Sequence, residues 1–282
     1  MKIIAGIVTF NPELDRLREN IEAVFPQVDQ LILVDNGSEN TAAMKELVSK
    51  ISGDIHVIEL GSNKGIAYAL NVIGQTAIDQ RFDWFLTLDQ DTIILSDLVE
   101  TYKRYTHLPS VGTLSCEFQD LNKDETILPD EEYSEVNRVI TSAALMNTEK
   151  FAHSGRFDNQ MFIDLVDYDI NIDYKLRGYK IYKINKIGFY HEIGESEPYR
   201  LFGRKVETSN HSAFRKYYLA RNAIYLRKKY GTNSDTKNYL TVVRDDFFKI
   251  LLFEKDKMAK FKAIFKGLYD GMTMKVEKWH EN

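Results

Sequence analysis

The chain contains a single cysteine, five prolines and fifteen glycines among its 282 residues. A lone Cys116 excludes a disulfide framework and is typical of a protein that works in a reducing compartment such as the cytoplasm. The few prolines and glycines exclude a fibrous or low-complexity chain. Because 44% of the residues are apolar, the sequence can bury a sizeable core. Its length suits one large α/β domain, or one domain with a helical appendage.

Strong positive charge and long apolar runs are also missing. The formal net charge is −5, and we expect no nucleic acid as a partner, because general nucleic-acid binding needs a basic surface. No stretch reaches about 18 uninterrupted apolar residues, so no transmembrane helix is expected. The apolar start looks like a signal peptide, but it ends at Thr9-Phe10-Asn11-Pro12 without a small-residue cleavage site. We therefore predict a first strand there.

Within the first hundred residues, short apolar runs alternate with segments of helical periodicity. The apolar runs predict strands at 3–9, 30–34, 55–60 and 84–88. The periodic segments between them predict helices at 14–24, 41–51 and 66–80. This alternation is typical of a parallel sheet with right-handed crossovers and helices on both faces. Because such strands end at one edge of the sheet, the polar residues that follow them should converge: Thr9, Asp35, Asn63 and Asp89.

The second part of the chain mixes strands and helices less regularly. Strands are predicted at 111–118, 138–146 and 180–190, with an acidic, polar insert over 119–135. Helices are predicted at the end of 162–176, after a loop, at 214–230, and once or twice between 245 and 282.

The most informative motif is Asp89-Gln90-Asp91, which follows the apolar strand 84–88. It would lie at the carboxyl edge of the sheet, where open α/β sheets bind ligands. Two carboxylates this close repel each other unless a cation or hydrogen-bond donors compensate them. A divalent metal that carries a diphosphate is one such compensator, since Mg²⁺ and Mn²⁺ prefer hard oxygen ligands. A solvated turn after a strand is the alternative.

Two other strand-end loops carry candidate binding groups. Asp35-Asn36-Gly37-Ser38 is either a plain turn or a site where the Asp35 carboxylate accepts a hydrogen bond from a nucleobase. Gly61-Ser62-Asn63-Lys64-Gly65 lacks the spacing of a phosphate loop, and no Gly-x-Gly-x-x-Gly follows the first strand. This loop either contributes to the same site or caps the helix that starts near Ile66.

A second acidic cluster lies downstream. Residues 161–169 place Asp164, Asp167 and Asp169 among apolar and aromatic residues. Such surroundings favour a carboxylate that acts as a general base, whereas N-capping of the following helix is the structural alternative. His191, directly after the strand at 180–190, is either structural or a metal ligand.

The C-terminal part is rich in basic and aromatic residues. Residues 211–222 either hold the diphosphate of a lipid-linked acceptor through Arg and Tyr side chains or form a surface helix. Farther on, phenylalanines, leucines and isoleucines mix with lysines between 247 and 268. Such a basic amphipathic segment lies on an anionic membrane surface, packs on its own domain or packs on a second subunit in a homodimer.

Together these segments resemble a known family. The chain is similar to the family 2 glycosyltransferases of the inverting GT-A type, in their rhamnosyltransferase-like branch. The matching motifs run in the family's order: Val8-Thr9-Phe10-Asn11-Pro12, Val34-Asp35-Asn36-Gly37-Ser38, Asn63-Lys64-Gly65-Ile66-Ala67, Leu88-Asp89-Gln90-Asp91, Phe162-Ile163-Asp164-Leu165-Val166-Asp167-Tyr168-Asp169, Arg215-Lys216-Tyr217-Tyr218 and Arg221-Asn222. Seven motifs in order are specific for the family and less specific for the sugar.

The resemblance implies a GT-A fold: a Rossmann-like, mainly parallel central sheet flanked by helices, with a C-terminal helical extension. The glycosyltransferase domain would span 1–230, divided into a nucleotide-binding half at 1–100 and an acceptor and catalytic half at 101–230. The helical extension would span 231–282.

The resemblance also implies roles for individual residues. The nucleotide would be bound by Thr9, Asn11, Asp35, Asn63, Lys64, Gly65 and Asp89. The Mg²⁺ or Mn²⁺ ion would be held by Asp91 and His191, with Asp89 nearby. The acceptor or its diphosphate would meet Arg215, Tyr218 and Arg221. The family usually places its base in a pair of acids before a helix. Here Val166 replaces the first acid, so Asp167 matches the base and Asp164 is the second candidate.

The implied reaction is the inverting transfer of a sugar from a dTDP- or UDP-sugar to a glycan or lipid-linked acceptor in bacterial cell-wall or capsule polysaccharide synthesis. Rhamnose from dTDP-rhamnose is the expected donor, and UDP-galactose, UDP-galactofuranose and UDP-glucose are alternatives. A nucleotidyltransferase would usually show a Gly-rich or Arg-Lys phosphate loop after the first strand. A non-catalytic sugar-nucleotide module would not need Asp91, Asp167 and His191 in one cleft.

Overall fold

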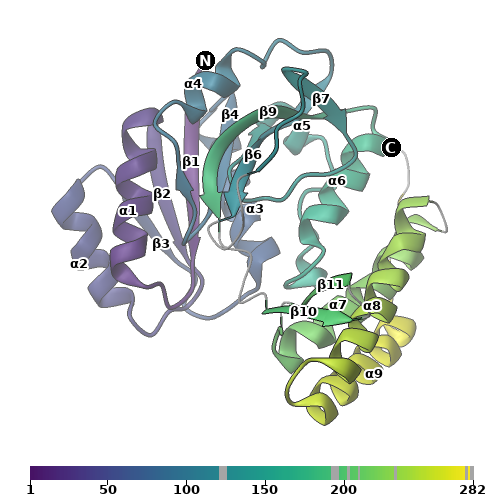
Figure 1. The fold of residues 1–282 in the computed structure, drawn as a ribbon. Coiled ribbons are helices and arrows are strands. Elements are labelled where there is room, and N and C mark those ends of the chain that lie inside the picture. Colours follow the sequence, from purple (N-terminus) through teal and green to yellow (C-terminus); the bar gives the residue numbers. More distant parts are fainter. Residues whose placement is uncertain are drawn as a thin grey trace. The chain divides into compact units, whose positions relative to one another are not determined.

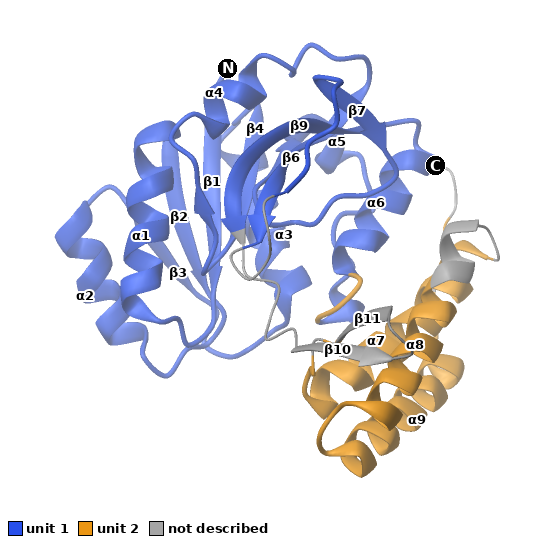
Figure 2. Cartoon of the chain, viewed as in Figure 1, with its two compact units in different colours: residues 1–162, 166–192 blue, residues 163–165, 193–282 orange. Residues whose placement is uncertain are grey.

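The computed structural model describes residues 1–120, 126–191, 197–201, 204–208, 210–231, 234–276 and 279, with the backbone alone for 191, 197–201, 204–207 and 234–238. The chain forms two compact units (Figure 2). Unit 1 contains residues 1–162 and 166–192, and unit 2 contains 163–165 and 193–282. The structural division therefore falls near residue 192. The expected functional division at residue 230 stays a prediction.

Unit 1 is built on one sheet with the order β3-β2-β1-β4-β8-β6-β9-β5, and β7 pairs with β9 (Figure 1). Its strands are β1 Ile3–Thr9, β2 Gln30–Asp35, β3 His56–Glu59, β4 Trp84–Asp89, β5 Ile93–Ile94, β6 Val111–Asp120, β7 Tyr133–Val136, β8 Ala144–Asn147 and β9 Lys180–His191. The first four of these strands in sheet order, β3 to β4, are parallel. β8 then runs antiparallel to both β4 and β6.

Helices cover both faces of this sheet, as the alternating pattern predicts. They are α1 Leu14–Val24, α2 Thr41–Ile51, α3 Ile66–Asp79, α4 Leu98–Lys103, α5 Thr148–Ala152 and α6 Val166–Leu176. Every residue of β1 is buried, which is typical of a parallel strand with helices on both sides. Its alternate residues Ile3, Ala5 and Ile7 share one core with Leu17 and Ile21 of α1.

The opposite face of β1 is covered by α3 at close range. A Cβ built on Gly6 would lie 2.4 Å from the side chain of Ile73 on α3, so only glycine lets the helix approach this far. This contact holds the middle of α3 against the sheet.

One predicted strand is largely wrong. The expected strand at 138–146 exists only from Ala144 onward, and β7 lies instead inside the segment expected to be a polar insert. Side chains from other elements hold the carbonyls just before β8. The Thr87 hydroxyl donates to Thr141 O at 2.6 Å, and the Tyr102 hydroxyl donates to Ala143 O at 2.6 Å. Because these carbonyls accept bonds from side chains, the segment before Ala144 forms a loop and not a strand.

Unit 2 consists of the hairpin β10 Glu197–Leu201 and β11 Arg204–Thr208, followed by the helices α7 Ala213–Tyr230, α8 Ser234–Leu252 and α9 Lys257–Thr273. The sequence predicts helix only from residue 245, so α8 begins earlier than expected. Two glycines bring α9 against α7: a Cβ on Gly267 would lie 2.3 Å from Tyr217 O, and one on Gly271 would lie 2.7 Å from Arg221 O. In the described part of the chain, no helix has the length and apolar character needed to cross a membrane.

Candidate active site

The strand ends of unit 1 meet as the sequence predicts. Thr9 and Asp35 are partners in the β1–β2 ladder, and Val8 pairs with Asp89 in the β1–β4 ladder. The β2–β3 side joins them through Asn36, whose amide donates to Asn63 Oδ1 at 3.1 Å. The expected convergence of these polar residues at one sheet edge is confirmed.

Asp35 is almost fully buried, with 1% of its surface exposed, and its carboxylate organises its own turn. It accepts hydrogen bonds from the Ser38 N–H at 3.2 Å, from the Ser38 hydroxyl, and from the Thr41 hydroxyl at 2.8 Å. The Thr9 hydroxyl donates to the same group at 3.4 Å. The turn interpretation therefore describes the observed contacts. A further bond to a nucleobase stays a prediction.

Asn11 ties the end of β1 to the same turn. Its N–H donates to the Ser38 hydroxyl at 2.8 Å, and its side-chain oxygen accepts from the Glu39 N–H at 2.7 Å. Its φ of 48° is left-handed, a conformation that asparagine tolerates better than most residues.

The loop at 61–65 both starts α3 and touches the segment that precedes α6. Asn63 Oδ1 accepts from the Gly65 N–H at 3.0 Å, and the Lys64 N–H donates to Asn36 Oδ1 at 2.8 Å. Gly65 has a φ of 89°, and a Cβ there would lie 2.7 Å from Phe162 O. The Ile66 N–H, the first of α3, donates to the same carbonyl at 2.7 Å. Gly65 of the loop is therefore the N-cap residue of α3, but no loop side chain makes a capping bond to the helix, and the loop contacts the backbone next to the second acidic cluster.

The turn Asp89-Gln90-Asp91 is held by side chains that use its backbone. Asn20 Nδ2 on α1 donates to Asp89 O at 2.7 Å, and Arg16 Nε, one helical turn earlier, donates to Asp91 O at 3.0 Å. Gln90 Oε1 accepts from the Phe10 N–H at 2.8 Å. These bonds fix the turn through its main-chain atoms and the central glutamine.

Sequence reasoning missed Asn20 and Arg16. A signal was present, because Asn20 occupies a fully buried position of α1 beside Leu17, Ile21 and Val24. A polar residue at a core position of a helix needs a partner elsewhere in the fold. The sequence alone could not say that this partner is the main chain of the acidic motif.

The donor groups near this turn suit a hard cation. Among the described side chains no three His, Cys, Asp or Glu come together, and none forms an ion pair or hydrogen bond with the Asp91 carboxylate. Mg²⁺ is commonly held by one or two carboxylates with substrate phosphates completing its shell, so a pair of acids on a fixed turn fits such an ion. His191 lies outside the described side chains. Its backbone is near, because Ile93 pairs with Tyr190, the residue before it.

Asp167 lies in the first turn of α6 and lines a cavity of about 150 Å³. Its Oδ1 accepts a hydrogen bond of 3.0 Å from the Tyr168 N–H. The Arg138 guanidinium lies 4.8 Å from the centre of the Tyr168 ring. Burial raises the pKa of the Tyr168 hydroxyl, and the negative charge of Asp167 raises it further. The positive charge of Arg138 acts in the opposite direction and lowers it. The remaining wall is mainly apolar: Ser115, Cys116, Phe118, Val139, Ile140 and Lys183.

Asp164 has a different environment, in unit 2. Arg215 of α7 donates two hydrogen bonds to its carboxylate oxygen Oδ1, from Nη2 at 2.5 Å and from Nε at 3.2 Å. Asn222, two turns farther along α7, donates to both Ile163 O and Asp164 O at 2.8 Å. Asp164 and Leu165 both have positive φ, so α7 stabilises a strained loop.

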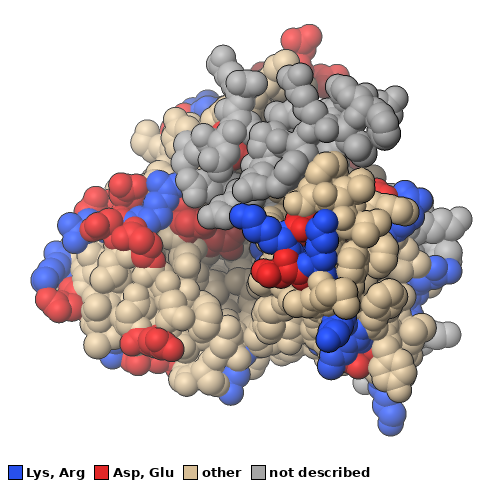
Figure 3. Space-filling model, turned by 60° about the horizontal axis from the view of Figure 1, so that its bottom comes forward, with Lys and Arg blue, Asp and Glu red and all other residues tan. Residues whose placement is uncertain are grey.

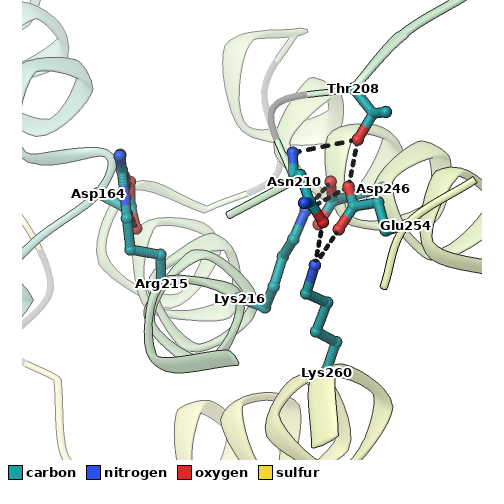
Figure 4. A network of polar contacts seen from close by, with 8 residues as sticks. All are labelled: Asp164, Thr208, Asn210, Arg215, Lys216, Asp246, Glu254 and Lys260. Carbon is teal, nitrogen blue, oxygen red and sulfur yellow. Dashed lines mark hydrogen bonds and ion pairs between the residues drawn. The ribbon is translucent and has the colours of Figure 1, made fainter. Parts of the chain in front are cut away.

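The other predicted acceptor residues also have partners within unit 2. The Arg221 guanidinium lies 4.6 Å from the centre of the Tyr218 ring and donates to Asn222 Oδ1 at 2.8 Å. Lys216, adjacent to Arg215, points to a different side of α7 (Figure 4). There it is buried against Asp246 at 2.6 Å and Glu254 at 3.1 Å. Part of this basic, aromatic segment therefore assembles the helices of unit 2.

The sequence model of a family described as glycosyl transferase family 2 matches residues 5–151. The matched segment begins within β1 and contains β2 to β4 and the whole Asp89-Gln90-Asp91 turn. Of the residues predicted for the site, Asp164, Asp167, His191, Arg215, Tyr218 and Arg221 lie beyond it.

Curated relatives and solved structures extend the likeness beyond residue 151. The dTDP-rhamnosyl transferase RfbF of Shigella flexneri is 28% identical over 243 residues, 80% of this chain and 80% of the relative. The poly-beta-1,6-N-acetyl-D-glucosamine synthase of Staphylococcus aureus strain COL is 29% identical over 182 residues, 57% of this chain and 42% of the relative. The mannosyltransferase PcManGT from Pyrobaculum calidifontis, solved with GDP-Man and Mn²⁺, aligns over 98% of this chain and 76% of its own, with a TM-score of 0.61 and 14% identity. The expected GT-A fold is confirmed.

Proposed function

Because the chain belongs to glycosyl transferase family 2, we propose that it transfers rhamnose from dTDP-rhamnose to a glycan or lipid-linked acceptor of a bacterial surface polysaccharide. That it is a glycosyltransferase follows from the family and from the relatives. One structural observation carries the proposal of a donor site. The Asp89-Gln90-Asp91 turn lies at the same sheet edge as Asp35 and the 63–65 loop, which is where sheets of this kind bind nucleotides.

The choice of rhamnose is supported by the relative whose alignment covers most of both chains. The Shigella protein is named for dTDP-rhamnosyl transfer and aligns over 80% of both chains. The synthase of Staphylococcus is named for a different sugar, but it aligns over 42% of its own length. UDP-galactose, UDP-galactofuranose and UDP-glucose are the alternative donors. A nucleotidyltransferase and a non-catalytic module both fit the family less well.

We propose Mg²⁺ or Mn²⁺ as the cofactor. Asp91 would hold the ion, with Asp89 and His191 beside it, and the solved mannosyltransferase contains Mn²⁺. When bound, the ion would offset the negative charge that develops on the leaving nucleoside diphosphate. The protein itself positions the acidic turn, since Asn20 and Arg16 hold its main chain before any donor binds. Thr9, Asn11, Asp35 and the 63–65 loop are the proposed nucleotide contacts.

For the base we favour Asp167. An acceptor hydroxyl is a poor nucleophile, so a carboxylate must take its proton as the oxygen attacks the anomeric carbon and the bond to the diphosphate breaks. In-line attack inverts that carbon. Asp167 lines a cavity, whereas the carboxylate of Asp164 forms an ion pair with the Arg215 guanidinium. Arg215, Tyr218 and Arg221 stay proposed acceptor contacts, although each already has a partner in unit 2.

The proposal is tested by a thermal-shift screen of dTDP-, UDP- and GDP-sugars, with Mn²⁺ and with EDTA. We expect dTDP-rhamnose with Mn²⁺ to raise the unfolding temperature most. Product analysis with that donor and a rhamnan or lipid-linked acceptor then measures transfer directly. A larger, metal-dependent shift with a UDP-sugar would replace rhamnose as the donor. No shift with any nucleotide sugar would contradict the donor site itself.

A further inference from the structure

Helix α9 has a buried face and an opposite face that is apolar and uncovered within the described chain. The buried face packs against α7 through Ile264, Gly267 and Gly271. Along the opposite face, large apolar side chains recur at helical spacing and remain 60% to 70% exposed: Met258, Phe265, Tyr269 and Met272. An amphipathic helix normally hides such residues, so this stripe lies on the wrong side for the core of unit 2.

The stripe continues onto the end of α8. Phe248, Leu251 and Leu252 are about half exposed. The ring of Phe247 connects the two helices, because its centre lies 6.3 Å from that of Phe248 and 6.1 Å from that of Phe265. We call these seven exposed residues of α8 and α9 the apolar face: Phe248, Leu251, Leu252, Met258, Phe265, Tyr269 and Met272. A contiguous exposed apolar surface of this kind usually marks a binding surface.

Lysines border the apolar face. Lys255, Lys257 and Lys262 are exposed around Met258, and Lys266 lies beside Phe265. The only acid within α9 is Asp270, which is paired with Lys266 at 2.6 Å and accepts from the Tyr217 hydroxyl at 2.7 Å. In Figure 3, the lower right of the molecule is mostly uncharged, and the charges that interrupt it there are mainly blue. Exposed Asp256 lies between Lys255 and Lys257, but the lysines outnumber the acids along the border, which is therefore net cationic although the whole chain carries −5.

The lysines around the apolar face indicate which kind of partner it binds. Two copies of the chain joined symmetrically through this face would bring the same lysines towards each other, which like charges oppose. An anionic lipid surface offers the complementary charge, and its interface accepts aromatic, Met and Leu side chains while lysines reach the headgroups. We propose that the apolar face of unit 2 docks on the surface of a bilayer that contains anionic lipids. This surface is independent of the donor chemistry and does not require the proposed sugar to be correct.

Vesicle co-sedimentation with the full chain, without donor or acceptor, tests this surface. The vesicles contain phosphatidylcholine alone or a mixture with phosphatidylglycerol. We expect the wild type to bind the anionic vesicles and to dissociate as salt is raised from 0.05 to about 0.5 M, since salt screens surface charge. The double variant Met258→Ser/Phe265→Ser should bind at least tenfold more weakly, and so should Lys255→Glu/Lys262→Glu.

Matched controls lie in unit 1. Ile127 is 94% exposed and Lys50 is exposed on α2, so Ile127→Ser and Lys50→Glu should leave vesicle binding unchanged. All substituted side chains are exposed, and unfolding temperatures should stay close to that of the wild type. Equal binding by the wild type and the apolar-face variants would overturn the proposal. So would a stable dimer in solution that the same variants dissociate, because the face would then belong to a second copy.

Discussion

The side-chain amide of Asn20 donates a 2.7 Å hydrogen bond to the main-chain carbonyl of Asp89. This bond joins a buried position of α1 to the first residue of the acidic turn. Partners that orient metal-binding groups typically change metal affinity by about 10- to 100-fold when removed. We therefore predict that Asn20→Ala weakens metal-dependent donor binding about tenfold, measured by calorimetry with Mn²⁺ and with EDTA.

Gln27 provides the control for this prediction. It lies just after α1 and donates to Leu95 O at 2.9 Å, on the far side of β5 from the acidic turn. Gln27→Ala should lower the unfolding temperature and leave the Mn²⁺-dependent part of donor affinity unchanged. If both variants alter stability alone, Asn20 serves folding and has no role in positioning the turn.

Asp91 is the residue whose loss should mimic removal of the metal. In Asp91→Ala, donor affinity with Mn²⁺ should fall to the value that the wild type shows in EDTA, because the proposed site loses its main carboxylate. Glu100→Ala, which removes an exposed acid on α4, should behave as the wild type. Unchanged nucleotide affinity with Mn²⁺ in Asp91→Ala would remove Asp91 from the metal site.

Asp167→Asn should separate binding from turnover. General bases contribute about 10²- to 10⁴-fold to rate, so we expect kcat to fall by that range with donor affinity within twofold of the wild type. Asp164→Asn should keep turnover within about tenfold, because Arg215 engages that carboxylate. The reverse ranking of the two variants would transfer the role of base to Asp164.

Gly65 and Gly61 form a matched pair in one loop. Both have positive φ, but a Cβ on Gly65 would lie 2.7 Å from Phe162 O, whereas one on Gly61 would meet nothing within 4 Å. Gly61→Ala should cost about 1 to 2 kcal/mol from backbone strain alone. Gly65→Ala should cost at least about 1 kcal/mol more, since the Phe162 segment must shift. Urea unfolding measures both, and equal losses would argue against the contact.

His211 predicts a loss of stability in mild acid. Burial lowers the pKa of His211 to about 4, with the neighbouring Arg215 charge acting in the same direction. The unfolded chain therefore binds a proton that the folded chain does not, between pH 6.5 and about 4, and stability falls as the pH falls through that range. Allowing for solvent screening, we expect His211→Gln to remove about 1 to 2 kcal/mol of this loss. Identical pH profiles of unfolding for the variant and the wild type would contradict it.

The strands and helices of the first hundred residues could be predicted because each apolar run is closed by turn residues within a few positions. The strand at 138–146 could not, because hydroxyls from Thr87 and Tyr102 take the carbonyls of Thr141 and Ala143, just before β8 begins. The early start of α8 follows from Tyr239 and Val243, which are buried at helical spacing ahead of Ile250. That period is visible in the sequence, but only packing on α7 shows that it belongs to the same helix.

The sequence by itself determined the alternating α/β pattern, the polar residues at each strand end and their meeting at one edge, since hydrophobic period and parallel topology fix these locally. Tertiary structure decided which groups those residues contact. Asp35 satisfies its own turn and Arg215 holds Asp164, while Asn20 and Arg16 hold the acidic turn by its carbonyls. The bonds of Arg215, Asn20 and Arg16 join residues distant along the chain, and those of Asn20 and Arg16 end on main-chain carbonyls that every sequence contains. No residue pattern could therefore reveal them before the chain was folded.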